Sequence, residues 1–487
     1  MTIQYDNFNN RITVVGTAAD IPFVVQPKGT GALQAQLTDS TTTGGNARGA
    51  NAVDLQTTRF TATNVASGAQ SVIVGGYANS SVGTGCFVGS GYGNSAGGFV
   101  SVIGGGQSNS ISNSTIYSGI VSGIANTASG FFNFVGGGSS NSGTSVSAVT
   151  TQSATMNGTT AVTLSTSNAN IKVGQYISGT YAAGTYVAAI SGTSLTLSSA
   201  ASGSGTATLS FNTPHGVVVG GGNNTATGSY SFIGGGGDAG TAGNRNVASG
   251  DWSTVGGGSK NVASGIASVI AGGGVEFNTN YGNTASGSSS FIGSGILNIA
   301  SGSGSVVGGG WQNQANGSTS TIVGGRLGFT RAITGNTVIP ANNDAFSGGS
   351  FGMIQTAILA IGRQTTDATA TRLTSDASST GSTTNQVILP NNSAYFFTGE
   401  VVAGVTGGGN TKGWTIEGVI KRGANAASTA LVGTPTVTST YADAGASTWV
   451  IAVTADTTNG GLAVTFTGQA STTIRTVCQI RTTEMTY

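Results

Sequence analysis

The residues of this chain that could take part in catalysis or metal binding are few and scattered. The single histidine, His215, is the only imidazole available for a catalytic triad or metal site, and we interpret it as a turn or junction residue. Cys86 and Cys478 lie in different regions, which predicts two separate thiols and no disulfide. Cys86 occupies a position that serine fills in neighbouring repeats, so we expect a small side chain in a tight turn.

Carboxylates offer a second route to chemistry, because glycan hydrolysis uses two carboxyl groups about 5–9.5 Å apart. The central repeats contain Asp238, Asp251 and Glu276, and stacking of repeats could bring the last two together. Each of them lies among solvent-type residues, however. The repeats also lack the recurring aspartate of calcium-binding rolls and the lysine of a phosphate-binding loop. We therefore expect that the chain is not an enzyme and binds no metal or cofactor.

Aromatic side chains could bind a ligand without catalysis. Tyr176, Tyr181 and Tyr186 follow one another at intervals of five residues in a strand-rich segment. They could flank a sugar-binding surface, or they could pack the core of a small module, and the sequence leaves both interpretations open. Trp414 and Trp449 lie in strand-like runs, where we expect them to be buried.

The composition is neutral and rich in glycine. The 487 residues include 84 glycines but only 6 prolines, charged residues make up 6%, and the formal net charge is +1. No Asp, Glu, Lys or Arg occurs from residue 60 to residue 171, so we expect this stretch to be folded, with Ser, Thr and Asn facing water. The charge gives no basis for binding nucleic acid. We find neither a signal peptide nor an apolar run of membrane-spanning length, and expect no membrane insertion.

One short sequence pattern recurs through the middle of the chain, and the structure that it forms must position the candidate functional side chains. Residues 64–79 read NVASGAQSVIVGGYAN, and residues 246–261 read NVASGDWSTVGGGSKN. Twelve such frames are found by the residue that precedes each apolar pair: Ser71, Cys86, Ser101, Ser118, Asn133, Gly216, Ser231, Ser253, Ser268, Ser290, Ser305 and Thr321. A spacing of mostly 15 residues predicts a parallel β-solenoid whose units are stable only when stacked.

Each part of the frame has a structural interpretation. In a strand, alternate side chains point to opposite faces, so an apolar pair can bury one side chain and present the other to a neighbour. Glycine permits the turns, and a recurrent asparagine is expected to hydrogen-bond from coil to coil. We therefore expect two sets of structural repeat positions. They are Ser71, Ser101, Ser231, Ser253, Ser268, Ser290 and Ser305, and Asn79, Asn94, Asn109, Asn141, Asn261 and Asn313.

The pattern divides the chain into successive segments, and we expect all of them to be β-structure. Residues 1–64 carry no repeat and include two short strands (RITVV and IPFVVQP) and a polar loop or arm from Thr38 to Ala52. The repeats occupy residues 65–141 and 214–330, and residues 142–213 form an inserted small β-domain. Residues 331–357 are a connector. Longer strands in residues 358–487 predict a C-terminal antiparallel β-sandwich-like domain.

The frame resembles the YadA-type head repeat of trimeric autotransporter adhesins, and more closely the NTASG…SVVGGG arrays of phage tail-fibre and other virion fibre proteins. The segments QPKGTGALQAQ and IKRGANAASTALVGTPTV resemble, respectively, the N-terminal region of such fibres and a C-terminal β-domain of phage structural proteins. The resemblance implies an elongated homotrimeric fibre with a left-handed parallel β-roll shaft. Adhesins of this type carry an export signal and a membrane anchor, and we find neither here.

From these features we expect a phage virion fibre, made in the host cytoplasm, that projects a receptor-binding surface for host adsorption. Its expected partners are two further copies of itself, other virion proteins that contact residues 1–64, and a host cell-surface glycan. A tail fibre fits best. A purely structural or capsid-decorating fibre and a bacterial trimeric adhesin are the alternatives, and the sequence does not separate tail from head fibres.

Overall fold

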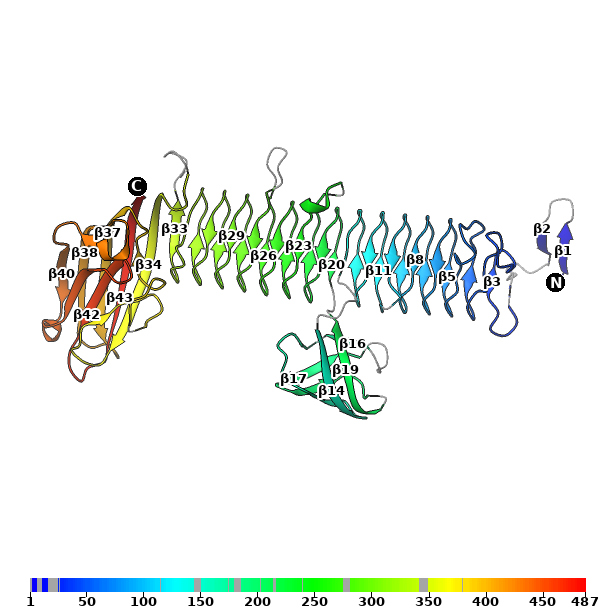
Figure 1. The fold of residues 1–487 in the computed structure, drawn as a ribbon, viewed down its shortest axis with the longest axis horizontal. Coiled ribbons are helices and arrows are strands. Elements are labelled where there is room, and N and C mark those ends of the chain that lie inside the picture. The colour runs from blue at the N-terminus through cyan, green and yellow to red at the C-terminus, as the bar shows by residue number, and fades with distance from the viewer. Residues whose placement is uncertain are drawn as a thin grey trace.

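The computed structural model shows a long rod with one sheet on its side and two sheets at its C-terminal end (Figure 1). The structure describes residues 2–6, 11–15, 25, 27–113, 115–143, 150–173, 175–178, 185–201, 203–212, 216–238, 240–274, 281–340, 349–378 and 380–487. The rod is a parallel β-solenoid of about 17 turns. At ~4.8 Å per turn it is about 80 Å long. The chain is all-β, as the sequence predicts.

Two parallel sheets run along the rod, built mostly from strands of only two residues. The first sheet consists of β3 (Leu33–Gln34), β4 (Val53–Asp54), β5 (Val72–Ile73), β7 (Phe87–Val88), β9 (Val102–Ile103), β11 (Gly119–Ile120), β13 (Phe134–Val135), β20 (Val217–Val218), β22 (Phe232–Ile233), β24 (Thr254–Val255), β26 (Val269–Ile270), β28 (Phe291–Ile292), β30 (Val306–Val307), β32 (Thr321–Ile322) and β33 (Thr337–Pro340). The second consists of β6 (Ser80–Ser81), β8 (Ser95–Ala96), β10 (Ser110–Ile111), β12 (Thr127–Ala128), β21 (Thr225–Ala226), β23 (Val247–Ala248), β25 (Val262–Ala263), β27 (Thr284–Ala285), β29 (Ile299–Ala300) and β31 (Gln314–Ala315).

The core of the rod is narrow. From β4 onward each two-residue strand of the rod points its second side chain inward, so a turn such as the one containing Ile270 and Ala263 buries one branched aliphatic residue and one alanine completely. Close stacking also demands glycine at the corner between the sheets. Gly76 has a φ of +89°, and a Cβ there would lie 2.3 Å from the carbonyl oxygen of Gly91 in the next turn. The sequence repeats because every turn meets these same steric demands.

The solenoid extends beyond the twelve frames at both ends. β3 and β4 stack in parallel below β5, so the expected boundary near residue 64 lies too late in the chain. At the other end β33 stacks on β32, which makes part of the expected connector a further turn. One frame also shifts by a residue. The buried position before β32 is Ser320, whereas Thr321 is the first residue of the strand.

The N-terminal strands β1 (Thr2–Asp6) and β2 (Arg11–Val15) form an antiparallel hairpin, and most of the expected strand IPFVVQP lies outside the described residues. The segment from Thr38 to Ala52 is not the free arm that its polar composition suggests. Gly44 is buried, and Arg48 lies in a buried ion-pair network, so this segment packs onto the first turns.

The insertion forms a six-stranded antiparallel sheet on one side of the rod (Figure 1), in the order β16-β19-β14-β15-β18-β17. Its strands are β14 (Thr150–Asn157), β15 (Ala161–Leu164), β16 (Tyr176–Ser178), β17 (Val187–Ser191), β18 (Ser194–Leu197) and β19 (Ser204–Asn212). The sheet has its own buried cluster, which includes Leu209 and Phe211. The solenoid itself continues across the insertion, because Phe134 in β13 pairs directly with Val217 in β20.

Two antiparallel sheets close the C-terminal end around one core. The strands are β34 (Ile354–Thr365), β35 (Thr371–Arg372), β36 (Val387–Ile388), β37 (Ser393–Val405), β38 (Thr411–Arg422), β39 (Ala430–Leu431), β40 (Thr436–Ala442), β41 (Val450–Asp456), β42 (Gly461–Thr467) and β43 (Ile474–Thr486). β34 pairs antiparallel with β33, so the larger sheet continues from the rod. Trp414 and Trp449 are buried between the two sheets with Phe466, as their strand-like surroundings predict.

A buried polar cluster fixes the rod to these sheets. Arg331, just after the last repeat, pairs with Glu484 in β43 and donates a hydrogen bond of 2.8 Å to the carbonyl oxygen of Gly352. Gln355 donates to the same carboxylate at 2.8 Å. Within the described residues, helical structure is confined to the 3-10 turns η1 (Ala242–Asn244), η3 (Ala426–Ser428) and η4 (Ala444–Ala446).

Candidate functional site

The recurrent asparagines form a hydrogen-bonded ladder inside the rod. In each turn the side-chain oxygen accepts the backbone N–H of the asparagine in the next turn, as between Asn79 and Asn94 at 3.0 Å. The side-chain nitrogen donates to two carbonyl oxygens, which for Asn79 are those of Gly75 and Gly91, both at 3.0 Å. The full ladder is Asn79, Asn94, Asn109, Asn126, Asn141, Asn224, Asn246, Asn261, Asn283, Asn298 and Asn313. It adds Asn126, Asn224, Asn246, Asn283 and Asn298 to the expected positions.

Different residues end the ladder. At the N-terminal side Gln56 takes the asparagine position, accepting the N–H of Asn79 at 3.0 Å and donating to its carbonyl oxygen at 2.9 Å. At the other side the last acceptor, the side chain of Asn313, receives the N–H of Gly328 at 2.8 Å. The longer glutamine side chain reaches the backbone of Asn79 from a turn that does not follow the repeated sequence pattern, so the recurrence of asparagine does not predict it.

The serine positions are buried but do not form a comparable ladder. Ser71 donates a hydrogen bond of 2.7 Å to the carbonyl oxygen of Gly68. Ser101 makes a longer bond of 3.4 Å to Phe99. The other five hydroxyls, of Ser231, Ser253, Ser268, Ser290 and Ser305, are buried with no hydrogen-bond partner among the residues that the structure describes. Serine is therefore selected here for its small size more than for its hydroxyl.

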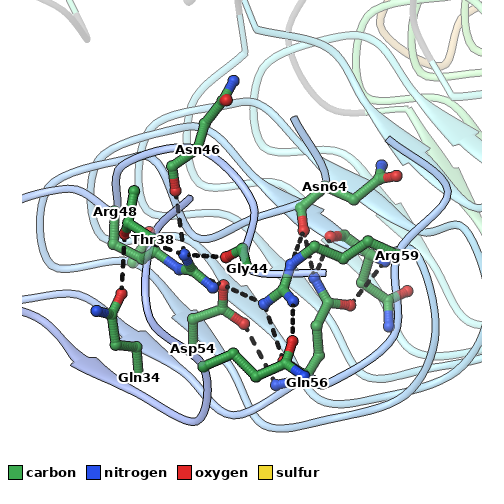
Figure 2. A network of polar contacts seen from close by, with 12 residues as sticks. Gln34, Thr38, Gly44, Asn46, Arg48, Asp54, Gln56, Arg59 and Asn64 are labelled. Atoms are coloured by element: carbon green, nitrogen blue, oxygen red, sulfur yellow. Dashed lines mark hydrogen bonds and ion pairs between the residues drawn. The ribbon is translucent and has the colours of Figure 1, made fainter. Parts of the chain in front are cut away.

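A buried ion-pair network covers the first turns of the rod (Figure 2). The carboxylate of Asp54 receives Arg48 at 2.8 Å and Arg59 at 3.2 Å, and all three side chains are almost completely buried. Arg59 also donates to the carbonyl oxygens of Gln56 and Asn64, at 2.9 and 3.1 Å. The network satisfies backbone acceptors that no further turn covers, so it acts as a cap on this end of the solenoid.

The three tyrosines expected as alternative glycan contacts have different environments. Tyr176 is 8% exposed and packs against Phe131 and Phe132 of the rod, with ring centroids 5.2 and 4.9 Å away. Burial, together with Tyr230 and Tyr186 nearby, raises the pKa of Tyr176 to about 12. Tyr186 is 41% exposed, and Tyr181 lies outside the described residues. Tyr176 thus attaches the insertion to the rod, whereas Tyr186 is open to solvent.

The residues that the sequence analysis considered for catalysis and set aside have separate environments in the described parts of the chain. Asp251 pairs with Lys172 of the insertion and accepts the N–H of Ser229 at 3.1 Å. Asp238 accepts hydrogen bonds within its own loop, the largest effect being from Asn244, and these lower its pKa. His215 and Glu276 lie outside the described residues.

Both cysteines are free and buried, and burial raises the pKa of Cys478 to about 12. Among the described residues no three His, Cys, Asp or Glu side chains form a group that could hold a metal ion. No helix of this described part has the length and apolar character that a membrane span requires.

The outer face of the larger C-terminal sheet carries carboxylates that lie outside the repeats and the insertion. Two adjoining hollows of about 460 and 430 Å³ lie on this face, and Glu400 lines both. Glu417 lines the second hollow with Arg481, while the 79% exposed Tyr441 borders the first. Glu400 and Glu417 lie diagonally across β37 and β38, opposite Thr415 and Thr398 respectively. Only the pairing of these strands places the two carboxylates on one face.

The same end of the molecule contains two carboxylates with lowered pKa values. Although burial opposes ionisation, hydrogen bonds from Ser378 and Asn385 lower the pKa of Asp376 to about 2. Burial also opposes ionisation of Asp456, but hydrogen bonds from Asn459 and Gln386 lower its pKa well below the usual range.

The first long sheet presents a row of outward apolar side chains, which we call the apolar face. Its members are Val72, Phe87, Val102, Phe134, Val217, Phe232, Val269, Phe291 and Val306. Val102 is 46% exposed and Phe134 42%. In the N-terminal half of the rod, the outward positions of the second sheet are instead serine and threonine, such as Ser80 and Thr127. The rod therefore has one apolar and one polar side there.

The molecule is thus a parallel β-solenoid rod with appended antiparallel sheets. No protein-family model matches the chain, and no curated protein matches it in sequence. A similar solved structure is the tailspike protein gp49 from Acinetobacter baumannii bacteriophage Fri1, a capsular polysaccharide depolymerase. The similarity covers 92% of this chain and 70% of that one, at 8% sequence identity and a TM-score of 0.19.

This comparison contradicts the expectation that the chain is not an enzyme, because the tailspike with the similar structure is one. We withdraw that expectation. It rested on the repeats and the insertion alone, and it omitted Glu400 and Glu417 on the C-terminal sheet. At this level of similarity the comparison assigns no activity or substrate to the present chain.

Proposed function

We propose that this chain is a fibre of a phage particle, most simply a tail fibre, that holds a host-binding surface away from the virion. The observation that carries the proposal is the shape of the molecule. A rod of about 17 turns bears extra surface in two places, the insertion on its side and the sheets at its C-terminal end (Figure 1). A rod of this kind separates one end of a chain from the other, and the sequence resemblance to virion fibres favours the same function.

The apolar face supports association of the rod with further copies of itself, and the sequence resemblance to virion fibres is the reason for three chains. It places an apolar side chain on the surface of most turns between β5 and β30, with Gly119 and Thr254 as interruptions. Each member is already more than half buried, so covering it would add only part of the about 1.5–3 kcal/mol that full burial of such a side chain contributes. A single narrow turn buries only one branched aliphatic residue and one alanine, so burial between chains would add substantially to its stability. The polar side carries mostly Ser and Thr in the N-terminal half and suits contact with solvent.

In this proposal residues 1–64 contact other virion proteins, and the insertion and residues 358–487 face the host. The ion-pair cap at Asp54 gives the first turns a firm end from which the N-terminal hairpin could attach. Three copies of a weak binding surface on one fibre would raise the avidity for a host glycan without any new contact.

Deletion of the insertion tests the receptor function directly. Joining Ser145 to Pro214 should leave the rod intact, because it restores a step of about 15 residues between Phe134 and Val217 and keeps Ser142, which bridges Thr127 and Thr225. Asn141 already accepts the N–H of Asn224 at 3.1 Å across the insertion. We expect particles with this deletion, or with residues 358–487 removed, to assemble but to adsorb less well to the host. Unchanged adsorption in both would favour the structural or capsid-decorating fibre.

Sedimentation of the purified chain tests the oligomeric state, with a trimer expected. Electron microscopy of particles with a labelled C-terminus would separate a tail fibre from a head fibre. Labelling on bacterial cells that carry no phage would favour the adhesin alternative.

A further inference from the structure

A row of aromatic rings, which we call the aromatic ladder, runs along one edge of the rod and across the base of the insertion. Its members are Phe99, Tyr117, Phe132, Tyr176, Tyr186, Tyr230 and Trp252. Ring centroids lie 5.3 Å apart between Tyr117 and Phe132 and 4.9 Å between Phe132 and Tyr176. At the far side Tyr230 and Trp252 are stacked, with planes 8° apart and centroids 5.9 Å apart.

The backbone of the ladder is strained where it lies on the rod. Tyr117, Phe132, Tyr230 and Trp252 all have a φ between 50° and 57°, in the left-handed region that glycine and asparagine tolerate best. Bulky aromatic residues at such positions are unfavourable for folding. Strain that is retained in several turns points to a function that needs these side chains.

The same edge position carries no aromatic residue in the turns beyond the ladder. Towards the C-terminus it is occupied by Ala267, Ser289, Gly304 and Thr319, and towards the N-terminus by Val100, Gly85 and Gln70. Aromatic residues are therefore not required by the solenoid itself. They occur only in the turns beside the insertion.

The rings are held firmly but remain open to solvent. Tyr117 is 51% exposed, Tyr186 41%, Tyr230 38% and Trp252 52%. The buried Tyr176 anchors the row. The charges beside Trp252 neutralise each other, because its neighbour Asp251 pairs with Lys172 of the insertion.

We propose that the aromatic ladder binds an extended, uncharged polysaccharide that lies along the rod and stacks its sugar rings on the exposed aromatic faces. The inference rests on the proposed function, for which it names the site and the ligand class. The apolar faces of sugars pack on aromatic rings, and tyrosine and tryptophan add hydrogen-bonding groups at their edges. A series of rings at intervals of 5–6 Å suits a repeating polymer better than a compact ligand.

Self-association of the rod explains the ladder less well. The apolar face, our proposed contact between copies, extends from Val72 to Val306 over most of the rod, with interruptions at Gly119 and Thr254. The aromatic ladder stops at Trp252 on one side and follows the insertion rather than the solenoid. A contact between chains of equal length would have no reason to be restricted to these turns.

The test compares the wild-type fibre with Tyr117→Asn and Trp252→Asn on a microarray of neutral bacterial surface oligosaccharides, followed by calorimetric titration of the best-bound sugar. Asparagine tolerates the left-handed backbone, so both variants should fold at least as stably as the wild type. We expect affinity to fall at least tenfold in each. Thr319→Asn is the matched control, because Thr319 occupies the same left-handed edge position, with a φ of 50°, several turns beyond the ladder, and this variant should bind as the wild type does.

Three results would overturn the proposal. They are that the wild type binds no neutral oligosaccharide, that both variants bind the sugar as tightly as the wild type, or that Trp252→Asn loses the oligomer. A competition assay separates this inference from the proposed function. If free wild-type fibre and Trp252→Asn block host adsorption equally, the ladder is not the receptor site while the fibre function stands. If the wild type binds the sugar through the ladder but never affects adsorption, the site stands and the receptor function fails.

Discussion

Replacement of Asn261 by alanine should open the middle of the rod. The side-chain oxygen of Asn261 accepts the backbone N–H of Asn283 at 3.0 Å, and its nitrogen donates to the carbonyl oxygens of Gly257 and Gly273 at 2.9 and 3.0 Å. The same oxygen also accepts the side-chain N–H of Asn283 at 3.1 Å, and alanine removes all four bonds in a fully buried site. Gly273 keeps a second donor, the N–H of Ser259, so two backbone groups are left unpaired.

A buried polar group left without a partner costs about 1–3 kcal/mol, so the expected loss is about 2–6 kcal/mol. Because turns of a solenoid contact mainly their neighbours, the loss should be local. Hydrogen exchange followed by mass spectrometry measures it. Peptides from residues 246–298 should exchange about 30-fold faster or more, since 1.4 kcal/mol corresponds to a factor of ten.

Two comparisons sharpen this prediction. Ser264→Ala in the same turn removes an exposed hydroxyl and should leave exchange unchanged. Asn261→Asp keeps the acceptor for Asn283 but turns a carboxylate towards the carbonyl oxygens of Gly257 and Gly273, and it should also destabilise the rod. Exchange within about fivefold of the wild type in Asn261→Ala would refute the idea that the ladder stabilises the stack.

Other parts of the molecule give three further predictions. Asp54→Asn should leave two buried guanidinium groups without their carboxylate, at a cost of about 3–5 kcal/mol, and should speed hydrogen exchange in residues 33–60, whereas Asp367→Asn at the surface should not. Ser268→Ala removes a buried hydroxyl that has no partner among the described residues, so thermal unfolding should occur at an unchanged or higher temperature, and a clear loss of stability would contradict this. Asp376 and Asp456 have lowered pKa values in the folded chain, so the stability they contribute is present above the ordinary pKa of about 4 and is lost as the pH falls towards 2. Hydrogen exchange, measured on the whole fibre as the pH is lowered, should therefore show peptides from the C-terminal sheets losing protection before peptides from the rod, which contains few carboxylates.

The repeating part of the fold could be predicted from the sequence because its contacts are periodic. When Val102 and Ile103 recur as an apolar pair at a fixed spacing, only parallel stacking puts every second side chain inside and every first one outside. The same argument predicts that Asn94 meets its equivalents along the axis, since identical residues at equal spacing must come into register.

The ends of the solenoid could not be predicted in this way. β3 and β4 lack the repeated frame, and their turns are completed by Gln56 and by the pair of arginines around Asp54. These residues lie close together only because the segment from Thr38 to Ala52 folds back onto the rod. A terminal turn has a neighbour on one side only, so it needs different polar partners and loses the repeat.

The sequence by itself determined the period, the inward and outward faces and the stacking of asparagines. Only the tertiary structure decided which distant residues share a surface. Tyr117 and Trp252 are separated by the whole insertion, yet they belong to one row, because β13 stacks directly on β20 and the insertion supplies Tyr176 between them. Glu400 and Glu417 likewise share a face through antiparallel pairing of β37 with β38. Periodic contacts follow from local spacing, whereas these contacts depend on which strands pair, and that is set by the packing of the whole chain.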